Sequence, residues 1–430
     1  MASMSSPTQA VADHTAEHVA LRGRVVTPQA VEEDGVVVVA EGRIVWVGPA
    51  EAATAASRPE VAKAARRAVV PEPGTTVLPG LVDVHNHGGG GAGFPDARHA
   101  DEAMVAVREH RRHGTTSLLA SLVTADRDTL LARAELLAGL ADAGEIVGIH
   151  AEGPFLSHAR RGAQSPDDLV AGDAGLVRDL AAAARGHLRT MTVAPEVDGV
   201  TGPGGAAEAL VEAGVVPSLG HTEATTDQAE LLLAQVAAQL RGVAEDGGPD
   251  RRATVTHLFN GMSPLHHRAP GPVAACLAAA ARGDAVVELI ADDVHLDPAT
   301  VRTVMQAVGA ENVALVTDAM AAAGMADGSY DLGPMAVTVR DGVARLTDPE
   351  DPDGGSIAGG TAHLIDVVRT AVAAGVPLVD AVRSASWVPA RALGLEDVGA
   401  LAAGRRADVL VTDGDLRVRR VLRAGTDVRL

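Results

Sequence analysis

Residues 82–87 read Val82-Asp83-Val84-His85-Asn86-His87, a short apolar strand that ends in a His-x-His pair. Alternate side chains of a strand point to the same face, so His85 and His87 can reach one ion together. Seven further apolar segments lie downstream, and each also ends in a polar or metal-capable residue. These ends carry Ser121, Glu152, Glu196, His221, His257, the segment 292–295 and Asp318. The arrangement predicts a metal-dependent hydrolase.

The central part of the chain alternates apolar strands with helices rich in Ala and Leu, which is typical of parallel βαβ units. The predicted strands are 76–84, 115–120, 146–150, 189–194, 215–220, 253–256, 285–291 and 313–317. The predicted helices are 101–113, 127–143, 167–185, 226–241, 298–308, 361–374 and 378–393. Eight such units predict an α/β fold, the (β/α)8 TIM-like barrel, whose catalytic groups come from the C-terminal strand ends. An open doubly wound sheet is the alternative, but no Gly-x-Gly-x-x-Gly follows the first strand.

Both ends of the chain carry short strands separated by Gly and acidic turns. These strands are 19–27, 36–40 and 43–48 at one end, and 407–412 and 418–422 at the other. Neither end alone supplies a sheet with two covered faces. We therefore predict one small β-sandwich built from residues 19–77 together with 395–430, a barrel over 78–394, and a flexible tail at 1–18.

Composition limits the possible partners. The chain holds 36 Lys and Arg against 56 Asp and Glu, a net charge of -20, which is not the basic footprint of a nucleic-acid-binding protein. No run of ~18 apolar residues predicts a membrane span, and residues 1–20 do not resemble a signal peptide. Cys276 is the only cysteine, so no internal disulfide can form. We expect a cytoplasmic protein with no nucleic-acid or membrane partner.

Imidazole and carboxylate groups are the ligands of zinc-type ions. The chain offers them at strand ends in His85, His87, Glu152, His221, His257 and Asp318. We predict a divalent metal centre with one or two ions; zinc suits these ligands, and iron, cobalt and manganese are the alternatives. The only lysine, Lys63, precedes the barrel, so a carboxylated lysine cannot bridge two ions and Glu152 is the candidate for that role.

Further residues near these strand ends carry chemistry. Asp318 can take a proton from an attacking water and pass it to a leaving amine, or it can cap the next helix. Asn260 and the backbone near Gly261 can donate to oxyanions. Arg268 can clamp a phosphate or carboxylate, or it can be a solvated loop cation. His295 is a further donor.

Several segments together resemble the N-acetylglucosamine-6-phosphate deacetylases of the amidohydrolase superfamily. The specific ones are His150-Ala-Glu-Gly-Pro-Phe155, Gly220-His-Thr222, Thr256-His-Leu-Phe-Asn-Gly-Met262, Val294-His-Leu296 and Val316-Thr-Asp-Ala319. The resemblance covers nearly the whole chain, from Pro79 to Val409. It implies hydrolysis of the acetamide of N-acetyl-D-glucosamine 6-phosphate to D-glucosamine 6-phosphate and acetate, in amino-sugar catabolism or cell-wall recycling. It also implies a homodimer whose partner subunit can reach the phosphate.

The resemblance also implies roles for single residues. Glu152, His221 and His257 would bind the principal metal, and Asp318 would be the catalytic acid and base. The residues that the resemblance implies as substrate contacts are Asn260, Gly261, Arg268, His295 and, in the loop 355–360, Ile357. Some members of the family lack the first-strand histidines and hold one ion, so His85 and His87 predict a second.

One position departs from the family. Gln164 stands where many members have a substrate-contacting histidine. As a predicted substrate contact, its amide can donate to the carbonyl or a sugar hydroxyl, but it cannot carry a proton at neutral pH. Three alternatives stay open: a deacetylase for N-acetylgalactosamine 6-phosphate, a D-aminoacylase, and an inactive scaffold that only binds partners.

Overall fold

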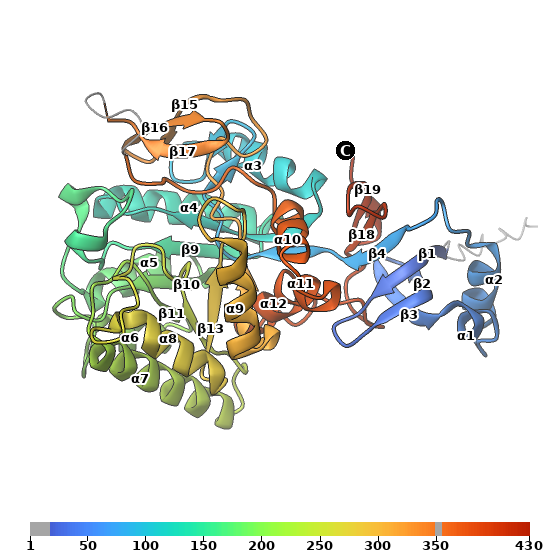
Figure 1. Ribbon diagram of the computed structural model, residues 1–430, viewed down its shortest axis with the longest axis horizontal. Helices are drawn as coiled ribbons and strands as arrows, with labels where there is room; N and C mark the ends of the chain where they lie inside the picture. Colours follow the sequence, from blue (N-terminus) through green and yellow to red (C-terminus); the bar gives the residue numbers. More distant parts are fainter. Residues whose placement is uncertain (1–17, 349–354) are drawn as a thin grey trace, which may run out of the picture.

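The computed structural model describes residues 18–348 and 355–430, and it consists of a barrel flanked by a smaller sheet domain (Figure 1). The predicted tail falls outside these residues except for His18. Within the described residues, no helix is long and apolar enough to cross a membrane.

The barrel confirms the predicted fold class. Its sheet runs in the order β5 (Leu81–Asp83), β8 (Thr115–Leu122), β9 (Gly148–Glu152), β10 (Leu188–Val193), β11 (Val216–Leu219), β12 (Ala253–Val255), β13 (Ala285–Leu289), β14 (Val313–Leu315). Every neighbouring pair is parallel. The first and last strands then meet beyond their ends, where the Asp318 N–H donates to the His85 carbonyl at 3.0 Å. The seam that closes the barrel therefore runs through the predicted active-site residues.

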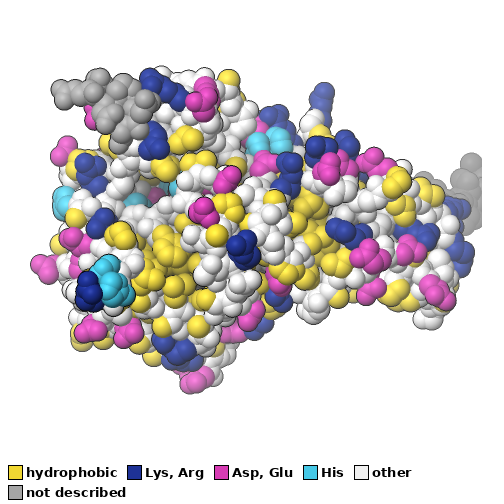
Figure 2. All heavy atoms as spheres, viewed as in Figure 1, with side chains coloured by type: hydrophobic (Ala, Val, Ile, Leu, Met, Phe, Trp, Pro, Cys, Tyr) yellow, Lys and Arg dark blue, Asp and Glu magenta, His cyan; other side chains and the backbone are white. Residues whose placement is uncertain are grey.

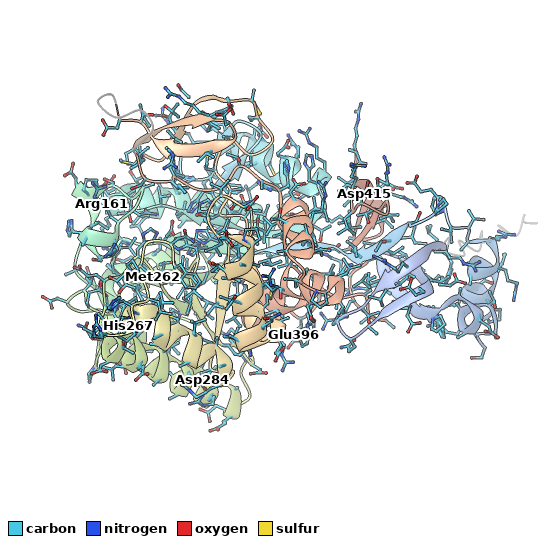
Figure 3. The ribbon with its side chains drawn as sticks, viewed as in Figure 1. Arg161, Met262, His267, Asp284, Glu396 and Asp415 are labelled. Atoms are coloured by element: carbon cyan, nitrogen blue, oxygen red, sulfur yellow. The ribbon has the colours of Figure 1, made fainter. Side chains whose placement is uncertain are left out.

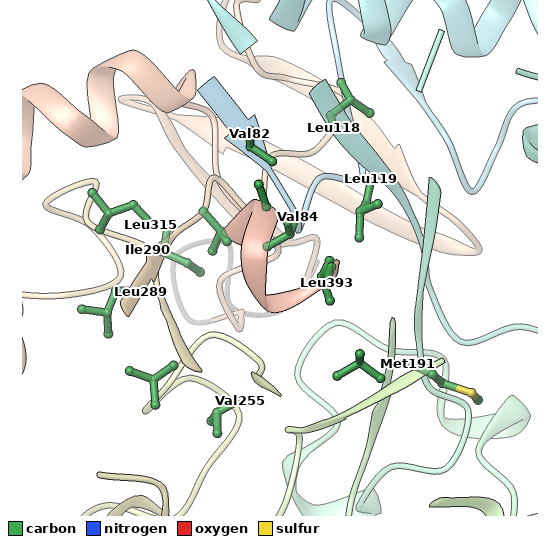
Figure 4. Packing of buried hydrophobic residues seen from close by; sticks show 14 of the residues in the cluster. Val82, Val84, Leu118, Leu119, Met191, Val255, Leu289, Ile290, Leu315 and Leu393 are labelled. Carbon is green, nitrogen blue, oxygen red and sulfur yellow. The ribbon is translucent and has the colours of Figure 1, made fainter. Parts of the chain in front are cut away.

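Buried aliphatic side chains hold the strands and helices together. Figure 4 shows Val82, Leu118, Val255 and Leu315 from four different strands within one continuous core. Aliphatic residues on such strands pack both inside the barrel and against the surrounding helices, which is why the strands read as nearly continuous apolar runs.

Helices cover the outside of the barrel. They are α3 (Ala100–Arg112), α4 (Arg127–Asp142), α5 (Ala174–Ala183), α6 (Ala206–Glu212), α7 (Thr226–Glu245), α8 (Gly271–Ala281), α9 (Pro298–Val308), α10 (Leu364–Ala373), α11 (Leu378–Ser384) and α12 (Trp387–Ala392). The predicted helix 167–185 was too long, because a 3-10 turn occupies Pro166–Asp168 and α5 begins after its N-cap Asp173. The predicted helix 378–393 breaks before Trp387, since Pro389 lacks the N–H needed to continue α11. The helices α6 and α8 were not predicted.

The two chain ends form one seven-stranded sheet, as predicted for the small domain. Its order is β20 (Thr426–Asp427), β19 (Val418–Arg423), β18 (Val409–Thr412), β4 (Thr76–Pro79), β1 (Val19–Val26), β2 (Val31–Ala40), β3 (Arg43–Pro49). The sheet curls, so that the edge strand β3 meets the segment before β18: the Ile44 N–H donates to the Arg405 carbonyl at 2.9 Å. One face encloses an aliphatic core, and the other packs on α1 (Ala50–Thr54) and α2 (Pro59–Arg67).

The predicted first barrel strand, 76–84, is in fact two strands in two sheets. β4 pairs with β1 and β18 of the terminal sheet, whereas β5 pairs with β8 of the barrel. The chain passes between them at Gly80, where a Cβ would lie 2.2 Å from the Thr116 hydroxyl oxygen. Strand pairing therefore puts the domain boundary at Gly80, slightly later than the predicted residue 78.

Two small insertions border the barrel mouth. One is the hairpin β6 (Gly88–Gly89) and β7 (Ala92–Gly93), directly after the His-x-His motif. The other is the three-stranded sheet β15 (Gly328–Leu332), β16 (Met335–Arg340) and β17 (Val343–Leu346), which packs on Met320 and Val123. Neither insertion was predicted.

Candidate metal centre and active site

Glu152, at the end of β9, lies at the centre of the site. Its Oε1 is 3.0 Å from His221 Nε2 and 2.9 Å from His257 Nε2. These two histidines follow β11 and β12, and their Nε2 atoms are 3.0 Å apart. All three side chains are buried and form one potential ion-binding group. The structure thus brings together the three residues predicted to bind the principal metal.

The first-strand histidines lie on the other side of the same carboxylate. Glu152 Oε2 is 3.2 Å from His87 Nε2, and His85 Nε2 is 3.1 Å from His87 Nε2. Asp318 Oδ1 approaches both histidines, at 3.2 Å from His85 and 3.3 Å from His87. Oε1 of Glu152 therefore faces His221 and His257, with His85 Nε2 at 3.6 Å, whereas Oε2 faces His87. A carboxylate placed in this way can bridge two ions.

The spacing of these donors suits a divalent ion. Ligands about 2.0–2.1 Å from a tetrahedral zinc are roughly 3.3 Å from one another, close to the separations of the Glu152, His221 and His257 atoms. His221 also donates its Nδ1–H to the Arg160 carbonyl at 2.8 Å, which leaves Nε2 as the free ligand atom. The His257 Nδ1 has no partner within the described residues, so its orientation depends on packing. The residues present fit a zinc-type ion.

The electrostatics of the site favour ionised carboxylates. Burial opposes ionisation of Glu152, but His221, His85 and the hydrogen bonds from the histidines hold its pKa well below the usual range. Asp318 is likewise buried, yet His85 and His87 keep its pKa below normal. In return, these carboxylates raise the pKa of His85 against the effect of burial. A bound cation would take the place of the protons that these histidines attract.

Three residues of the site have left-handed backbone conformations, which side chains other than Gly rarely adopt. The φ angles are +46° at His221, +26° at His257 and +47° at Asp318. Each follows the end of a barrel strand, where the chain turns sharply and directs the side chain into the barrel mouth. Such strain concentrates at functional sites, because the surrounding structure must hold it in place.

A cavity of about 410 Å³ opens above these ligands. It is lined by Glu152, His221, His257 and Asp318, and by four predicted substrate contacts: Asn260, Gly261, His295 and Ile357. His295 is held by Asp292, whose Oδ2 accepts from its Nδ1 at 2.8 Å. The structure therefore places all four beside the candidate metal ligands.

Gln164 also lines the cavity, but both ends of its amide are engaged. The Nε2 donates to Glu152 Oε2 at 2.6 Å, and the Oε1 accepts from the Thr124 N–H at 2.7 Å. In this conformation one N–H of the amide orients the Glu152 carboxylate, and the second N–H of the same nitrogen is left to donate to a substrate.

Arg268 is the one predicted site residue that lies neither among the clustered ligand candidates nor on the cavity wall; His85 is buried beneath the cavity, beside His87. Its side chain is exposed on the loop after β12, the loop that carries Met262 and His267 in Figure 3. Arg160, which sequence reasoning missed, lines the cavity instead and donates to the Ser263 hydroxyl at 3.2 Å. Its position between the Glu152 motif and Gln164 could have indicated a role in the site. The sequence alone, however, does not show where the side chain of a loop arginine points.

Two buried acids were also missed. Glu288 on β13 contacts His85, and Asp83 on β5 accepts from the Thr317 hydroxyl at 2.6 Å. Burial raises the pKa of Asp83 to about 6, although hydrogen bonds from Asn86 and Thr317 oppose the rise. A lone acid within an apolar strand was the available signal, because buried carboxylates are rare unless they have partners.

Comparison with known proteins gives consistent matches. Residues 76–427 match the amidohydrolase family. The N-acetylglucosamine-6-phosphate deacetylase of Lysinibacillus sphaericus is 34% identical over 366 residues, covering 82% of this chain and 85% of that protein. The N-acetylgalactosamine-6-phosphate deacetylase of Escherichia coli O157:H7 is 33% identical over 352 residues, covering 80% of this chain and 85% of that protein.

A solved structure extends the match to almost every residue. It is a variant of N-acetyl-D-glucosamine-6-phosphate deacetylase from Mycobacterium smegmatis in complex with N-acetyl-D-glucosamine-6-phosphate. The sequences are 41% identical, the TM-score is 0.82, and the match covers 96% of this chain and 100% of that chain.

Proposed function

This chain belongs to the amidohydrolase family, and we propose from that membership and from its active site that it is an N-acetylglucosamine-6-phosphate deacetylase. The reaction releases acetate and D-glucosamine 6-phosphate from N-acetyl-D-glucosamine 6-phosphate, and its role is in amino-sugar catabolism. The observation that carries the proposal is the convergence of Glu152, His221 and His257 beside Asp318, below a cavity that Arg160 lines.

Glu152, His221 and His257 would hold the principal ion, and His85 and His87 a second. We propose zinc, with iron, cobalt or manganese as alternatives. When bound, the ion polarises the acetamide carbonyl and acidifies the attacking water. Asp318 accepts the proton of that water and delivers it to the departing amine, for which an ionised carboxylate is required. Gln164 donates to Glu152 and fixes the orientation of that carboxylate.

The sugar phosphate would occupy the cavity above the centre. The Arg160 guanidinium supplies positive charge there, and Asn260 and the Gly261 N–H are donors on the same wall. His295, oriented by Asp292, faces the cavity as a donor to the sugar. These local donors offset the net charge of -20, which alone would repel an anionic substrate.

A homodimer is part of the proposal. An apolar groove lined by Phe259, Leu265, Leu277 and Val304 lies between the loop after β12 and the helices α8 and α9. Hydrophobic side chains also gather over these elements in Figure 2. A second copy covering this face would bury the groove and could carry Arg268 to its partner's phosphate site. Sedimentation of the purified protein, with and without Arg268→Ala, measures this assembly.

An acetate-release assay on a panel of compounds tests the activity. We expect N-acetyl-D-glucosamine 6-phosphate to give the highest kcat/KM and unphosphorylated N-acetylglucosamine to lose at least tenfold, since a charge-assisted phosphate contact contributes ~1.5–3 kcal/mol. Arg160→Ala should reduce the difference in kcat/KM between the phosphorylated and the unphosphorylated compound. Equal rates with and without phosphate would contradict the proposal, and no acetate from any compound would indicate an inactive scaffold.

A second candidate is the galacto epimer, because the Escherichia coli O157:H7 relative is an N-acetylgalactosamine-6-phosphate deacetylase. The two epimers differ in one hydroxyl, and the comparison of their kcat/KM in the same assay decides between them. An acetylated D-amino acid in the panel tests the D-aminoacylase alternative. We propose a cytoplasmic location, which the single, buried Cys276 supports.

A further inference from the structure

A buried carboxylate on β13 links the two halves of the metal centre. Glu288 is only 2% exposed and follows Val287, whose side chain packs in the aliphatic core. Its Oε2 accepts from the His85 Nδ1–H at 3.0 Å and from the backbone N–H of His257 at 3.1 Å. One oxygen atom therefore contacts the side chain of a ligand on one side and the backbone of a ligand on the other.

The contact with His85 fixes which ring nitrogen is available to an ion. Because the Glu288 oxygen accepts from Nδ1–H, a neutral His85 ring presents the lone pair of its Nε2 to a bound ion. That Nε2 points at the centre, 3.2 Å from Asp318 Oδ1 and 3.6 Å from Glu152 Oε1. The Nδ1 of His87 has no partner in the described part of the chain. Of the first-strand pair, His85 is therefore the histidine whose orientation is set by a hydrogen bond.

Packing alone does not explain an acid at this position. The flanking Val287 and Leu289 satisfy the barrel core, and an apolar residue in place of Glu288 would avoid burying a charge. What the carboxylate adds is a fixed tautomer at His85 and an acceptor for the His257 N–H, at a residue with a φ of +26°. Both effects act on the metal ligands.

We propose that Glu288 is a positioning residue that creates the second cation position, the one bounded by His85, His87, Glu152 and Asp318. The inference rests on the proposed metal centre and is independent of which sugar is deacetylated. Partners that orient ligand histidines typically change metal affinity by about 10–100-fold when they are replaced. The effect on the Glu152, His221 and His257 position is smaller, because there Glu288 touches only a backbone N–H.

The test is metal binding and does not use catalysis. Protein stripped with a chelator is dialysed against buffered Zn²⁺, and bound zinc per chain is measured by mass spectrometry. The wild type should bind two equivalents. Glu288→Gln, which keeps the shape but offers a weaker neutral acceptor, should weaken the second equivalent about 10–100-fold and leave the first close to wild type. In a His85→Ala background, Glu288→Gln should cause no further loss of zinc.

Glu109→Gln is the matched control. Glu109 on α3 is another buried carboxylate bonded to a histidine, His363, at 2.9 Å, and with His113 the pair forms a second group of potential ligands. Both zinc equivalents should survive this change. Loss of the second equivalent in Glu109→Gln would place that ion elsewhere and overturn the inference.

Three other outcomes would also overturn it: a single equivalent in the wild type, wild-type affinity for both equivalents in Glu288→Gln, or equal weakening of both. A wild type that binds no zinc, or any other divalent ion tested in the same way, would instead sink the proposed metal centre itself. The two failures are therefore distinguishable.

Discussion

Replacing Asp318 by Asn tests the proposed proton transfer most directly. The side chain is buried, and its Oδ1 lies 3.2 Å from His85 Nε2 and 3.3 Å from His87 Nε2. An amide of the same shape fills this space but cannot accept a proton at neutral pH. Asn also tolerates the left-handed backbone at this residue, so the substitution adds little strain.

The size of the effect follows from the role. A positioned acid or base contributes about 10²–10⁴-fold to a rate, or roughly 2.7–5.5 kcal/mol of barrier at 1.36 kcal/mol per tenfold. Asp318 would act twice in each cycle, as acceptor and then as donor, so we expect a fall in kcat of about 10³–10⁴-fold. KM should change little, because the cavity and Arg160 are unaltered.

The assay is acetate release at saturating N-acetyl-D-glucosamine 6-phosphate, with the zinc content of the same sample measured. Asp293→Asn is the control, since Asp293 is an exposed acid with a φ of +65° on the loop after the seventh strand. It should keep wild-type turnover. If Asp318→Asn retained zinc at Glu152, His221 and His257 and turned over within tenfold of the wild type, Asp318 would not be the base.

Three further outcomes are expected. Gly261→Ala should lose most of its bound zinc and its activity, because φ is +59° and a Cβ would lie 2.8 Å from His221 Nδ1; zinc content and the circular dichroism spectrum separate this from misfolding. Asp83→Asn should remove a pH-dependent loss of stability. Folding raises the pKa of Asp83 to about 6, so the folded state binds more protons than the unfolded state. The free energy of unfolding of the wild type therefore falls as the pH rises from about 4 through 6. The free energy of unfolding of the wild type minus that of Asp83→Asn should therefore decrease over that range, and a difference that stays flat contradicts the assignment. Removing the metal should lower Tm. Zinc added at about 100 times its Kd should raise the free energy of unfolding of the metal-free protein by ~2.7 kcal/mol. A Tm that does not depend on zinc contradicts a metal centre in the folded state.

The metal-ligand candidates could be predicted from sequence because each follows an apolar strand. Parallel strands of a barrel deliver their C-terminal ends to one mouth, so Glu152, His221, His257 and Asp318 had to converge once the fold was right. Glu288 and Asp83 escaped notice for the opposite reason. Both fall inside the predicted strands 76–84 and 285–291, although β5 in fact ends at Asp83, and only the closed barrel shows which face of the strand each one occupies.

The loops were less predictable than the strands. Arg160 and Arg268 are both loop arginines beside a ligand motif, yet Arg160 lines the cavity and Arg268 points to solvent. Nothing local distinguishes them, because loop direction depends on distant contacts such as that of Arg160 with Ser263. In the same way, the strand predicted over 76–84 concealed a change of sheet at Gly80, although Pro79-Gly80 within it is a turn signal.

The change of sheet at Gly80 couples the terminal domain mechanically to the first strand of the catalytic barrel. A single residue separates β4, at the centre of the terminal sheet, from β5, which leads into His85, and β4 pairs directly with β18 from the other end of the chain. Loosening the terminal sheet would pull on the seam where His85 and Asp318 close the barrel. Deleting β1 or β18 should therefore lower the metal affinity of a site remote from the deletion.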